Sequence, residues 1–135
     1  MLQQDSAGLR VLFLGGTGTI SASCVRLAVE AGMQVAVLNR GRNQQDRAVA
    51  PKAETLTADI TDDTALAAAI GDRTFDAVVN FLSYDTADAR RMVTLFGPRT
   101  GQYIHISSGS IYAKPVRQIP ISESTPPAPN PPRPK

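Results

Sequence analysis

Short apolar runs alternate with longer amphipathic segments in this chain, and the alternation constrains the fold more than any other feature. Five runs have the length and composition of buried strands: residues 10–14, 34–38, 55–57, 75–81 and 102–106. Apolar side chains at helical spacing predict helices between them, over residues 19–31, 62–70 and 85–96. Strands that alternate with helices form right-handed βαβ units. The sequence therefore predicts an α/β protein with a Rossmann-like, doubly wound parallel sheet whose strand order is 3-2-1-4-5.

Proline divides the chain into two parts. Seven of the 10 prolines lie between Pro120 and Pro134, and the residues from Thr125 onward include few side chains that could enter a core. Such a segment is typical of an extended or disordered tail. We expect one folded unit over residues 9–115, followed by a proline-rich tail over residues 116–135.

The charge balance and the scarcity of metal-binding residues argue against several classes of function. The chain has 14 Lys and Arg against 12 Asp and Glu, and a formal net charge of +2 does not favour binding to nucleic acid. A single Cys and a single His argue against a disulfide framework and a metal site. No apolar run approaches the ~20 residues of a membrane-spanning helix, and the N-terminus lacks the apolar segment of a signal peptide. We expect a cytoplasmic protein.

A glycine-rich turn, Leu-Gly-Gly-Thr-Gly-Thr-Ile-Ser over residues 14–21, joins the first predicted strand to the first helix. This is the place of the turn that binds the pyrophosphate of a dinucleotide. Glycine lets the phosphates approach the backbone, and the helix N-terminus favours their charge. Serine takes the last position, where glycine is usual, and is expected to move the helix slightly outward. A merely flexible turn is the alternative. The candidate cofactor-binding residues here are Gly15, Gly16, Thr17, Gly18, Thr19 and Ile20.

The end of the second predicted strand indicates which dinucleotide binds. Asp or Glu about 20 residues after the glycines usually holds the ribose hydroxyls of NAD, but this chain has Asn39, Arg40, Gly41 and Arg42 there. No acid would repel a 2′-phosphate, and each charged hydrogen bond from an arginine would contribute roughly 1.5–3 kcal/mol. The sequence predicts NADP(H), with NAD(H) as the second choice and Arg40 as the main discriminator. Solvated arginines without a role in binding are the alternative.

Asp59 and Ile60 follow the third predicted strand. A carboxylate there could accept the adenine amino group, and an apolar side chain could cover the ring. The alternative is that Asp59 belongs to the cap of the next helix, for which Thr61 is the predicted N-cap. For other residues we expect structural roles. Ile20, Cys24, Leu27, Ala28 and Ala31 are expected to share the inward face of the first helix. His105 is expected in the core, and Arg90 and Arg91 on the solvated side of their helix.

Five segments in succession resemble the landmarks of the extended short-chain dehydrogenase/reductase superfamily, and within it the NAD-dependent epimerase/dehydratase branch. They are residues 11–21, 37–41, 58–60, 75–80 and 103–112. The resemblance covers residues 10 to about 125 and is most specific at the glycine turn and at residues 107–112. It implies a Rossmann domain that binds a nicotinamide dinucleotide beside a small-molecule substrate.

The resemblance also implies roles for particular residues. Those around the pyrophosphate would be Gly15, Gly18, Thr19 and Ile20, and those at the adenine Asp59 and Ile60. Asn80 to Ser83, after the fourth predicted strand, would lie along the cofactor ribose, with Asn80 and Phe81 as its candidate binding residues. Ser107 is a further candidate for binding the cofactor. Ser108 falls where the family places its catalytic serine, whose hydroxyl would bind the substrate oxygen. Turn chemistry at a strand end is the alternative for both serines.

The chain departs from the family at the proton-transfer residues, a Tyr and a Lys spaced Tyr-x-x-x-Lys. The residues four positions after its three tyrosines are Asp88, Ser107 and Val116. The family's later, substrate-binding region is also missing from this sequence. The prediction is therefore a truncated, inactive, NADP(H)-binding part of an epimerase-, dehydratase- or reductase-like protein.

Two further hypotheses remain. One is a non-catalytic module that senses NADPH or binds a partner through its proline tail, where Pro129 to Pro132 fit the spacing P-x-x-P. The other is RNA binding, which the near-neutral charge disfavours. The fifth strand would leave an open edge and an open apolar face, so a homo-oligomer or a complementing second chain is also expected.

Overall fold

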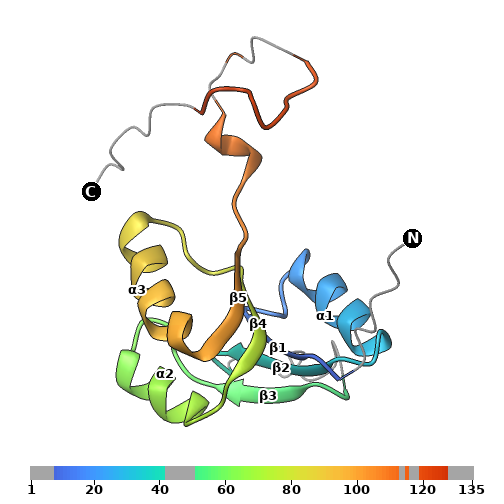
Figure 1. Ribbon diagram of the computed structural model, residues 1–135, viewed down its shortest axis with the longest axis vertical. Coiled ribbons are helices and arrows are strands. Elements are labelled where there is room, and N and C mark those ends of the chain that lie inside the picture. Colours follow the sequence, from blue (N-terminus) through green and yellow to red (C-terminus); the bar gives the residue numbers. More distant parts are fainter. Residues whose placement is uncertain (1–7, 42–50, 113–114, 116–118, 128–135) are drawn as a thin grey trace.

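The fold is a five-stranded parallel sheet with helices on both faces, as the computed structural model shows over residues 8–41, 51–112, 115 and 119–127 (Figure 1). The strands lie in the order β3-β2-β1-β4-β5, which confirms the predicted topology. The elements in chain order are β1 (Arg10–Leu14), α1 (Ser21–Glu30), β2 (Gln34–Asn39), β3 (Glu54–Thr57), α2 (Asp63–Ile70), β4 (Phe75–Asn80), α3 (Thr86–Phe96) and β5 (Thr100–His105). Short 3-10 turns follow at Gly97–Arg99 and Gly109–Ile111.

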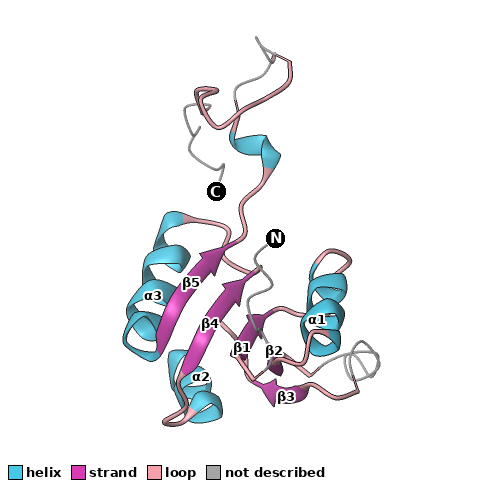
Figure 2. Ribbon diagram, turned by 45° about the vertical axis from the view of Figure 1, so that its right-hand side comes forward, coloured by secondary structure: helices cyan, strands magenta, loops and turns pink. Residues whose placement is uncertain are grey.

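The two faces of the sheet are covered unequally. Among the helices of the described residues, α2 and α3 cover one face and α1 covers the other, over β1 and β2 (Figures 1 and 2). The first face buries Leu12, Leu14, Leu38, Leu66 and Phe96, among others. The α1 face buries Val11, Phe13, Val25, Val35 and Val37, while Phe81, just after β4, and Ile104 of β5 are only partly covered. In a parallel sheet of this kind both faces are normally buried.

Helices α2 and α3 begin at aspartates that cap them. Asp62 accepts hydrogen bonds from the backbone amides of Thr64 and Ala65, and Asp85 accepts one from Asp88. The prediction of Thr61 as the N-cap is therefore wrong by one residue. The Thr61 hydroxyl instead donates to the Asp59 carboxylate, 2.7 Å away.

The predicted inward face of α1 is wrong except at Ala28, which is buried as expected. Ile20 and Leu27 are 71% and 63% exposed, and Cys24 is exposed as well. The buried residues of α1 are Ser21, Val25 and Ala28. Both sets have helical spacing. The buried face is the one that carries Ser21 and Val25, because these two residues pack against the glycine turn. The periodicity of the sequence does not distinguish these two faces.

His105 is also not a core residue. It is exposed, because it is the last residue of β5 and β5 is the edge strand of the sheet. Beyond it, the described residues from Ile106 onward run away from the sheet (Figure 1), and Pro127 forms an isolated antiparallel bridge with Tyr112. Arg42 and the Pro129–Pro132 motif lie outside the described residues. None of the helices in the described part of the chain has the length and apolar composition of a membrane span.

Candidate dinucleotide-binding site

The turn after β1 depends on Gly15. Its φ is +82°, and a Cβ atom there would lie 2.6 Å from Cγ of Leu82. The amide of Gly15 donates to the carbonyl of Leu38 over 3.0 Å, which joins the turn to the end of β2. Only glycine fits this conformation and this close approach without strain.

The start of α1 packs closely on the sheet at Gly16. A Cβ atom there would lie 2.7 Å from Cγ1 of Val37 and 2.9 Å from Cγ2 of Val25. The buried Ser21 hydroxyl accepts a hydrogen bond from the amide of Gly18, 2.9 Å away. The serine that takes the place of the usual last glycine therefore closes the turn internally, and Gly16 permits the close contact of helix and sheet.

A pocket of about 350 Å³ lies at the carboxyl ends of β1, β2 and β3. This size is within the roughly 300–1,000 Å³ of small-molecule sites. Three predicted segments meet in it, although they are distant in the sequence. The residues that line it are Gly15, Thr17, Leu38, Asn39, Arg40, Ala58, Asp59, Ile60, Thr61, Leu82, Ser83, Tyr84, Asp88 and Arg91.

Asn39 lines this pocket and carries a buried donor that is unsatisfied within the described residues. Its side chain is the last of β2, only 7% of the residue is exposed, and its Oδ1 accepts from the amide of Gly41 over 2.9 Å. Its Nδ2 has no hydrogen-bond partner among the described residues. A buried donor without a partner costs about 1–3 kcal/mol, so a ligand that accepts from Nδ2 would remove that cost. Arg40 follows at the exposed rim of the same pocket.

Asp59 and Ile60 form a turn that leads from β3 to α2. The amide of Ala58 donates to the carbonyl of Asn39, and the amide of Asp62 donates to the carbonyl of Asp59, both over 3.0 Å. The Asp59 carboxylate accepts from the amide of Thr61 over 2.9 Å. The alternative interpretation of Asp59, as part of the turn before the helix, therefore holds, and the same residue also lines the pocket.

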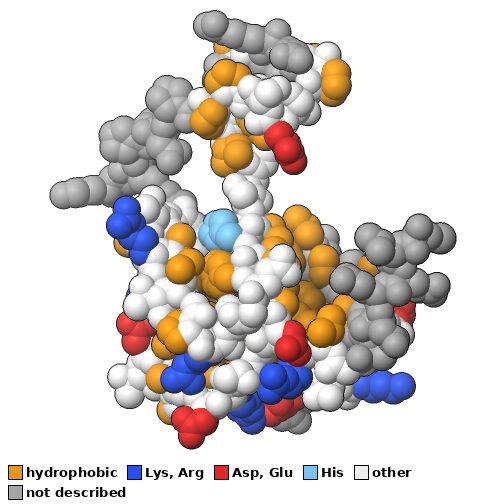
Figure 3. All heavy atoms as spheres, in the orientation of Figure 1, with side chains coloured by type: hydrophobic (Ala, Val, Ile, Leu, Met, Phe, Trp, Pro, Cys, Tyr) orange, Lys and Arg blue, Asp and Glu red, His pale blue; other side chains and the backbone are white. Residues whose placement is uncertain are grey.

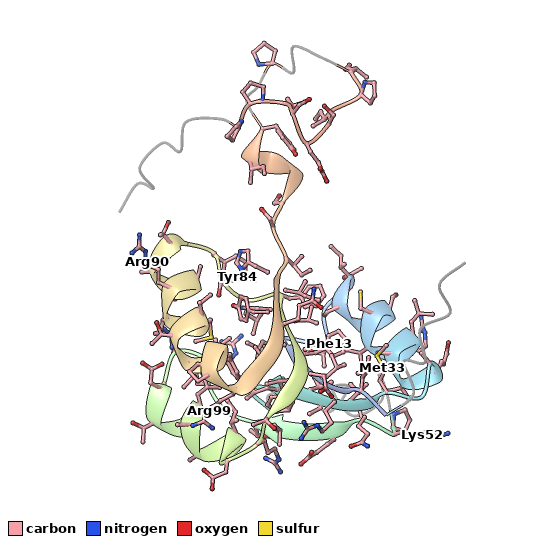
Figure 4. The ribbon with its side chains drawn as sticks, in the orientation of Figure 1. Phe13, Met33, Lys52, Tyr84, Arg90 and Arg99 are labelled. Atoms are coloured by element: carbon pink, nitrogen blue, oxygen red, sulfur yellow. The ribbon has the colours of Figure 1, made fainter. Side chains whose placement is uncertain are left out.

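Arg91 of α3 reaches across to this turn, which the sequence did not predict. Its Nη1 donates to the carbonyl of Ile60 over 2.8 Å and to Oδ1 of Asp63 over 2.5 Å. Its Nη2 lies 3.6 Å from Oδ1 of Asp88. The hydrogen bond that Arg91 donates to Asp63, together with the charges of Asp63 and Asp88, raises the pKa of Arg91 above its usual value, against a smaller opposing effect of burial. The prediction of a solvated face fails for Arg91, whereas Arg90 is exposed and points away from the sheet (Figure 4).

Tyr84, Asp88 and Arg91 are pocket residues that the sequence analysis missed. Tyr84 lies near the start of α3 (Figure 4). Because α3 starts directly after the carboxyl end of β4, its first two turns lie at the same edge of the sheet as the glycine turn. That connection was a signal available in the sequence.

Asn80 holds the loop after β4, whose residues Leu82 and Ser83 line the pocket. It is fully buried, and its Nδ2 donates to the hydroxyls of Ser83, 2.6 Å away, and Tyr103, 2.8 Å away. Its Oδ1 accepts from the amide of Leu82 over 2.8 Å. The next residue, Phe81, stacks on Phe13 with 6.5 Å between the ring centres. Neither Asn80 nor Phe81 lines the pocket itself.

The other predicted site residues lie outside the lining of this pocket. Gly18, Thr19 and Ile20 are exposed where the turn enters α1, and Gly16 is buried beneath it. Ser107 and Ser108 are exposed beyond the end of β5. The structure thus brings Gly15, Thr17, Asn39, Arg40, Asp59 and Ile60 together in one pocket, with Leu82 and Ser83 from the predicted segment after β4.

Known proteins share both the sequence pattern and the fold. A UDP-glucose 4-epimerase of Lactobacillus helveticus is 28% identical, over 87% of this chain and 41% of its own length. Among solved structures, a UDP-glucose 4-epimerase from Bifidobacterium longum in complex with NAD+ and UDP matches with a TM-score of 0.72 and 17% identity, over 88% of this chain and 42% of that one. The Bordetella bronchiseptica enzyme WbmH in complex with NAD+ matches with a TM-score of 0.72 and 20% identity, over 90% of this chain and 46% of that one.

The chain therefore spans less than half the length of these relatives. The sequence profile of the NAD dependent epimerase/dehydratase family matches residues 11–134, nearly the whole chain. Together with the strand order and the glycine turn between β1 and α1, this match shows that the chain belongs to the NAD dependent epimerase/dehydratase family.

Proposed function

We propose that this chain binds a nicotinamide dinucleotide in the pocket at the carboxyl ends of β1–β3, with NADP(H) preferred over NAD(H). The observation that carries the proposal is the meeting of three segments there: the glycine turn, the Asn39–Arg40 pair and the Asp59–Ile60 turn. In doubly wound sheets, ligands bind at this edge, beside the strand where the order reverses.

The proposed cofactor lies across these segments in a defined order. Its pyrophosphate lies at the turn and helix start over residues 15–20. Its adenine lies against Ile60, with its amino group donating to Asp59. Asn80 and Phe81 lie behind the residues that would contact the ribose. Ser107 lies nearer to the proposed position of the nicotinamide.

The preference for NADP(H) rests on Asn39 and Arg40. The unpaired Nδ2 of Asn39 is a donor, which suits the oxygen atoms of a 2′-phosphate. The guanidinium of Arg40, at the rim of the same pocket, adds a positive charge. No carboxylate stands at the end of β2 to repel the phosphate.

We further propose that residues 9–115 are the cofactor-binding unit of an epimerase-, dehydratase- or reductase-like protein and that this chain by itself does not turn over substrate. Ser108 would orient the substrate oxygen. No tyrosine in the sequence is followed four residues later by a lysine, so a positioned acid and base is missing, which costs about 10²- to 10⁴-fold in rate.

The part of the α1 face that the described residues leave partly exposed supports a further part of the proposal, pairing with a second copy or with a complementing chain. Hydrophobic side chains gather on this face between α1 and the segment that leaves β5 (Figure 3). Phe81 and Ile104 are partly covered there, and Ile106 is 36% exposed. Covering such a face would remove apolar surface from water.

A non-catalytic module that senses NADPH and binds a partner is the second candidate, and the proline-rich tail favours it, because extended proline segments suit aromatic-lined grooves. The two candidates share the cofactor site and differ in what happens after binding. A sensor changes its partner binding with the cofactor, whereas a cofactor-binding unit gains turnover when the missing part of the active site is added.

Thermal unfolding with and without NADPH and NADH tests the shared proposal. A ligand at 100 times its dissociation constant stabilises the native state by about 2.7 kcal/mol. We expect a higher melting temperature with either cofactor and a larger increase with NADPH at equal concentration. No increase with either cofactor would overturn the proposed function, and equal increases would overturn only the preference.

A further inference from the structure

We propose that Arg91 is a positioning residue that gives the pocket its preference for adenine, because it holds the backbone of Ile60, and with it the Asp59 carboxylate, against α3. This inference rests on the proposed function and extends it from the cofactor to the recognition of its base.

The position of Arg91 is the first part of the argument. The residue lies in the second turn of α3, far in sequence from the turn after β3, yet its Nη1 is 2.8 Å from the carbonyl oxygen of Ile60. The same nitrogen is 2.5 Å from Oδ1 of Asp63, the first residue of α2. One guanidinium therefore joins α3 to Ile60, which carries one of the proposed adenine contacts, and to the start of α2.

The hydrogen bonds that Ala58, Thr61 and Asp62 form in this segment do not reach α3. The bonds from Thr61 to the Asp59 carboxylate and from the Asp62 amide to the Asp59 carbonyl are internal to the turn. The hydrogen bond from the Ala58 amide to the Asn39 carbonyl holds only the beginning of the turn, which it ties to the end of β2. The internal bonds set the shape of the turn, and Arg91 sets its distance from α3, which forms the opposite side of the pocket.

The chemistry of the side chain suits this role. A guanidinium is planar and donates in several fixed directions, so it can hold a carbonyl and a carboxylate at the same time, whereas a lysine ammonium is a compact point charge. The Arg91 side chain is only 27% exposed, which limits competition from water. Both Ile60 and Arg91 line the pocket, so a shift of the turn changes the site directly.

Adenine and hypoxanthine separate this role from a merely structural one. The 6-amino group of adenine is a donor that a carboxylate accepts, whereas hypoxanthine has an oxygen acceptor there. If Arg91 places Asp59 opposite that position, loss of Arg91 removes the discrimination between the two bases. A general loss of stability would weaken the binding of both dinucleotides alike.

The test compares the dissociation constants of NADP and its hypoxanthine analogue, measured by titration calorimetry, for the wild-type chain and four variants. In the wild type we expect a preference for the adenine form of about tenfold, the effect of one hydrogen bond to a charged group. Arg91→Met is expected to lose most of that preference, with affinity for the hypoxanthine form changed less than about twofold. Arg90→Met removes the same charge from the neighbouring exposed position and is expected to keep the wild-type preference.

Two milder variants keep the inference testable if Arg91→Met does not fold. Arg91→Lys lacks the planar fork and is expected to reduce the preference by about threefold or more. Asp63→Asn weakens the ion pair but leaves the contact between Arg91 and Ile60, and is expected to keep the preference.

The possible results separate the two proposals. A wild-type chain that binds neither dinucleotide overturns the proposed function and this inference with it. A wild-type chain that binds both equally, or an Arg91 variant that discriminates as well as Arg90→Met, overturns this inference alone. A parallel loss of affinity for both dinucleotides in the Arg91 variants also overturns it, because that pattern shows a structural role only.

Discussion

The side-chain amide of Asn80 donates a hydrogen bond to the hydroxyl of Tyr103, 2.8 Å away, and so ties the carboxyl end of β4 to β5. The same amide donates to Ser83, in the loop that lines the proposed cofactor pocket. A buried polar group therefore connects the edge strand of the sheet to the wall of the site. Buried donors of this kind stabilise a fold only while all of their partners are in place.

Tyr103→Phe is expected to lower the free energy of unfolding by about 1–3 kcal/mol, because it removes one acceptor from a fully buried amide. Urea unfolding followed by circular dichroism measures the change. Tyr112→Phe removes the same hydroxyl from a tyrosine beyond the sheet and is expected to stay within about 0.5 kcal/mol of the wild type. Equal losses in the two variants would show that the contact with Asn80 contributes nothing.

Gly15→Ala is expected to destabilise the chain by about 1–3 kcal/mol and to weaken cofactor binding. The residue has φ +82°, and the new methyl group would meet Leu82, which lines the pocket. Gly97→Ala is the matched control, because Gly97 has φ −50° and open space around its Cβ position. Unfolding and NADPH titration are measured on both variants, and a Gly15→Ala chain as stable as the control contradicts the geometry of the turn.

Asn39→Asp is expected to reverse the cofactor preference. The substitution keeps the oxygen that accepts from the Gly41 amide but replaces the unpaired Nδ2 donor by a charged acceptor. A carboxylate repels a 2′-phosphate and accepts from ribose hydroxyls, so NADPH should lose roughly 10- to 100-fold in affinity and NADH should gain.

Arg40→Ala provides the comparison for that prediction. Arg40 lies at the exposed rim of the pocket. Its loss should therefore weaken the binding of NADPH without strengthening the binding of NADH. Calorimetric titration of both cofactors distinguishes the two variants. An Asn39→Asp chain that still prefers NADPH would be evidence that the end of β2 does not contact the 2′ position.

Val25→Ala and Leu27→Ala test which face of α1 is buried. Val25 is fully buried and Leu27 is 63% exposed. We therefore expect Val25→Ala to lower the free energy of unfolding by about 1.5–3 kcal/mol and Leu27→Ala to lower it by less than about 0.5 kcal/mol. Urea unfolding measures both. A larger loss at Leu27 would place the predicted face, with Ile20 and Cys24, in the core instead.

Much of the site could be predicted because its residues follow directly from the strands. Gly15, Asn39 and Asp59 each come at or just after the carboxyl end of a parallel strand, and all such ends meet at one edge of the sheet. Arg91 could not be predicted in the same way, because its partners Ile60 and Asp63 are brought to it by the packing of α2 and α3 against one face.

The amino-acid sequence by itself determined the alternation of strands and helices, the strand order and the glycine turn, because these depend on local periodicity and on the few connections that a parallel sheet permits. The tertiary structure decided which of two equally spaced faces of α1 is buried, the exposure of His105 at the sheet edge and the partners of Arg91 and Asn80. These features depend on contacts between residues distant in the sequence, and periodicity carries no information about which elements meet.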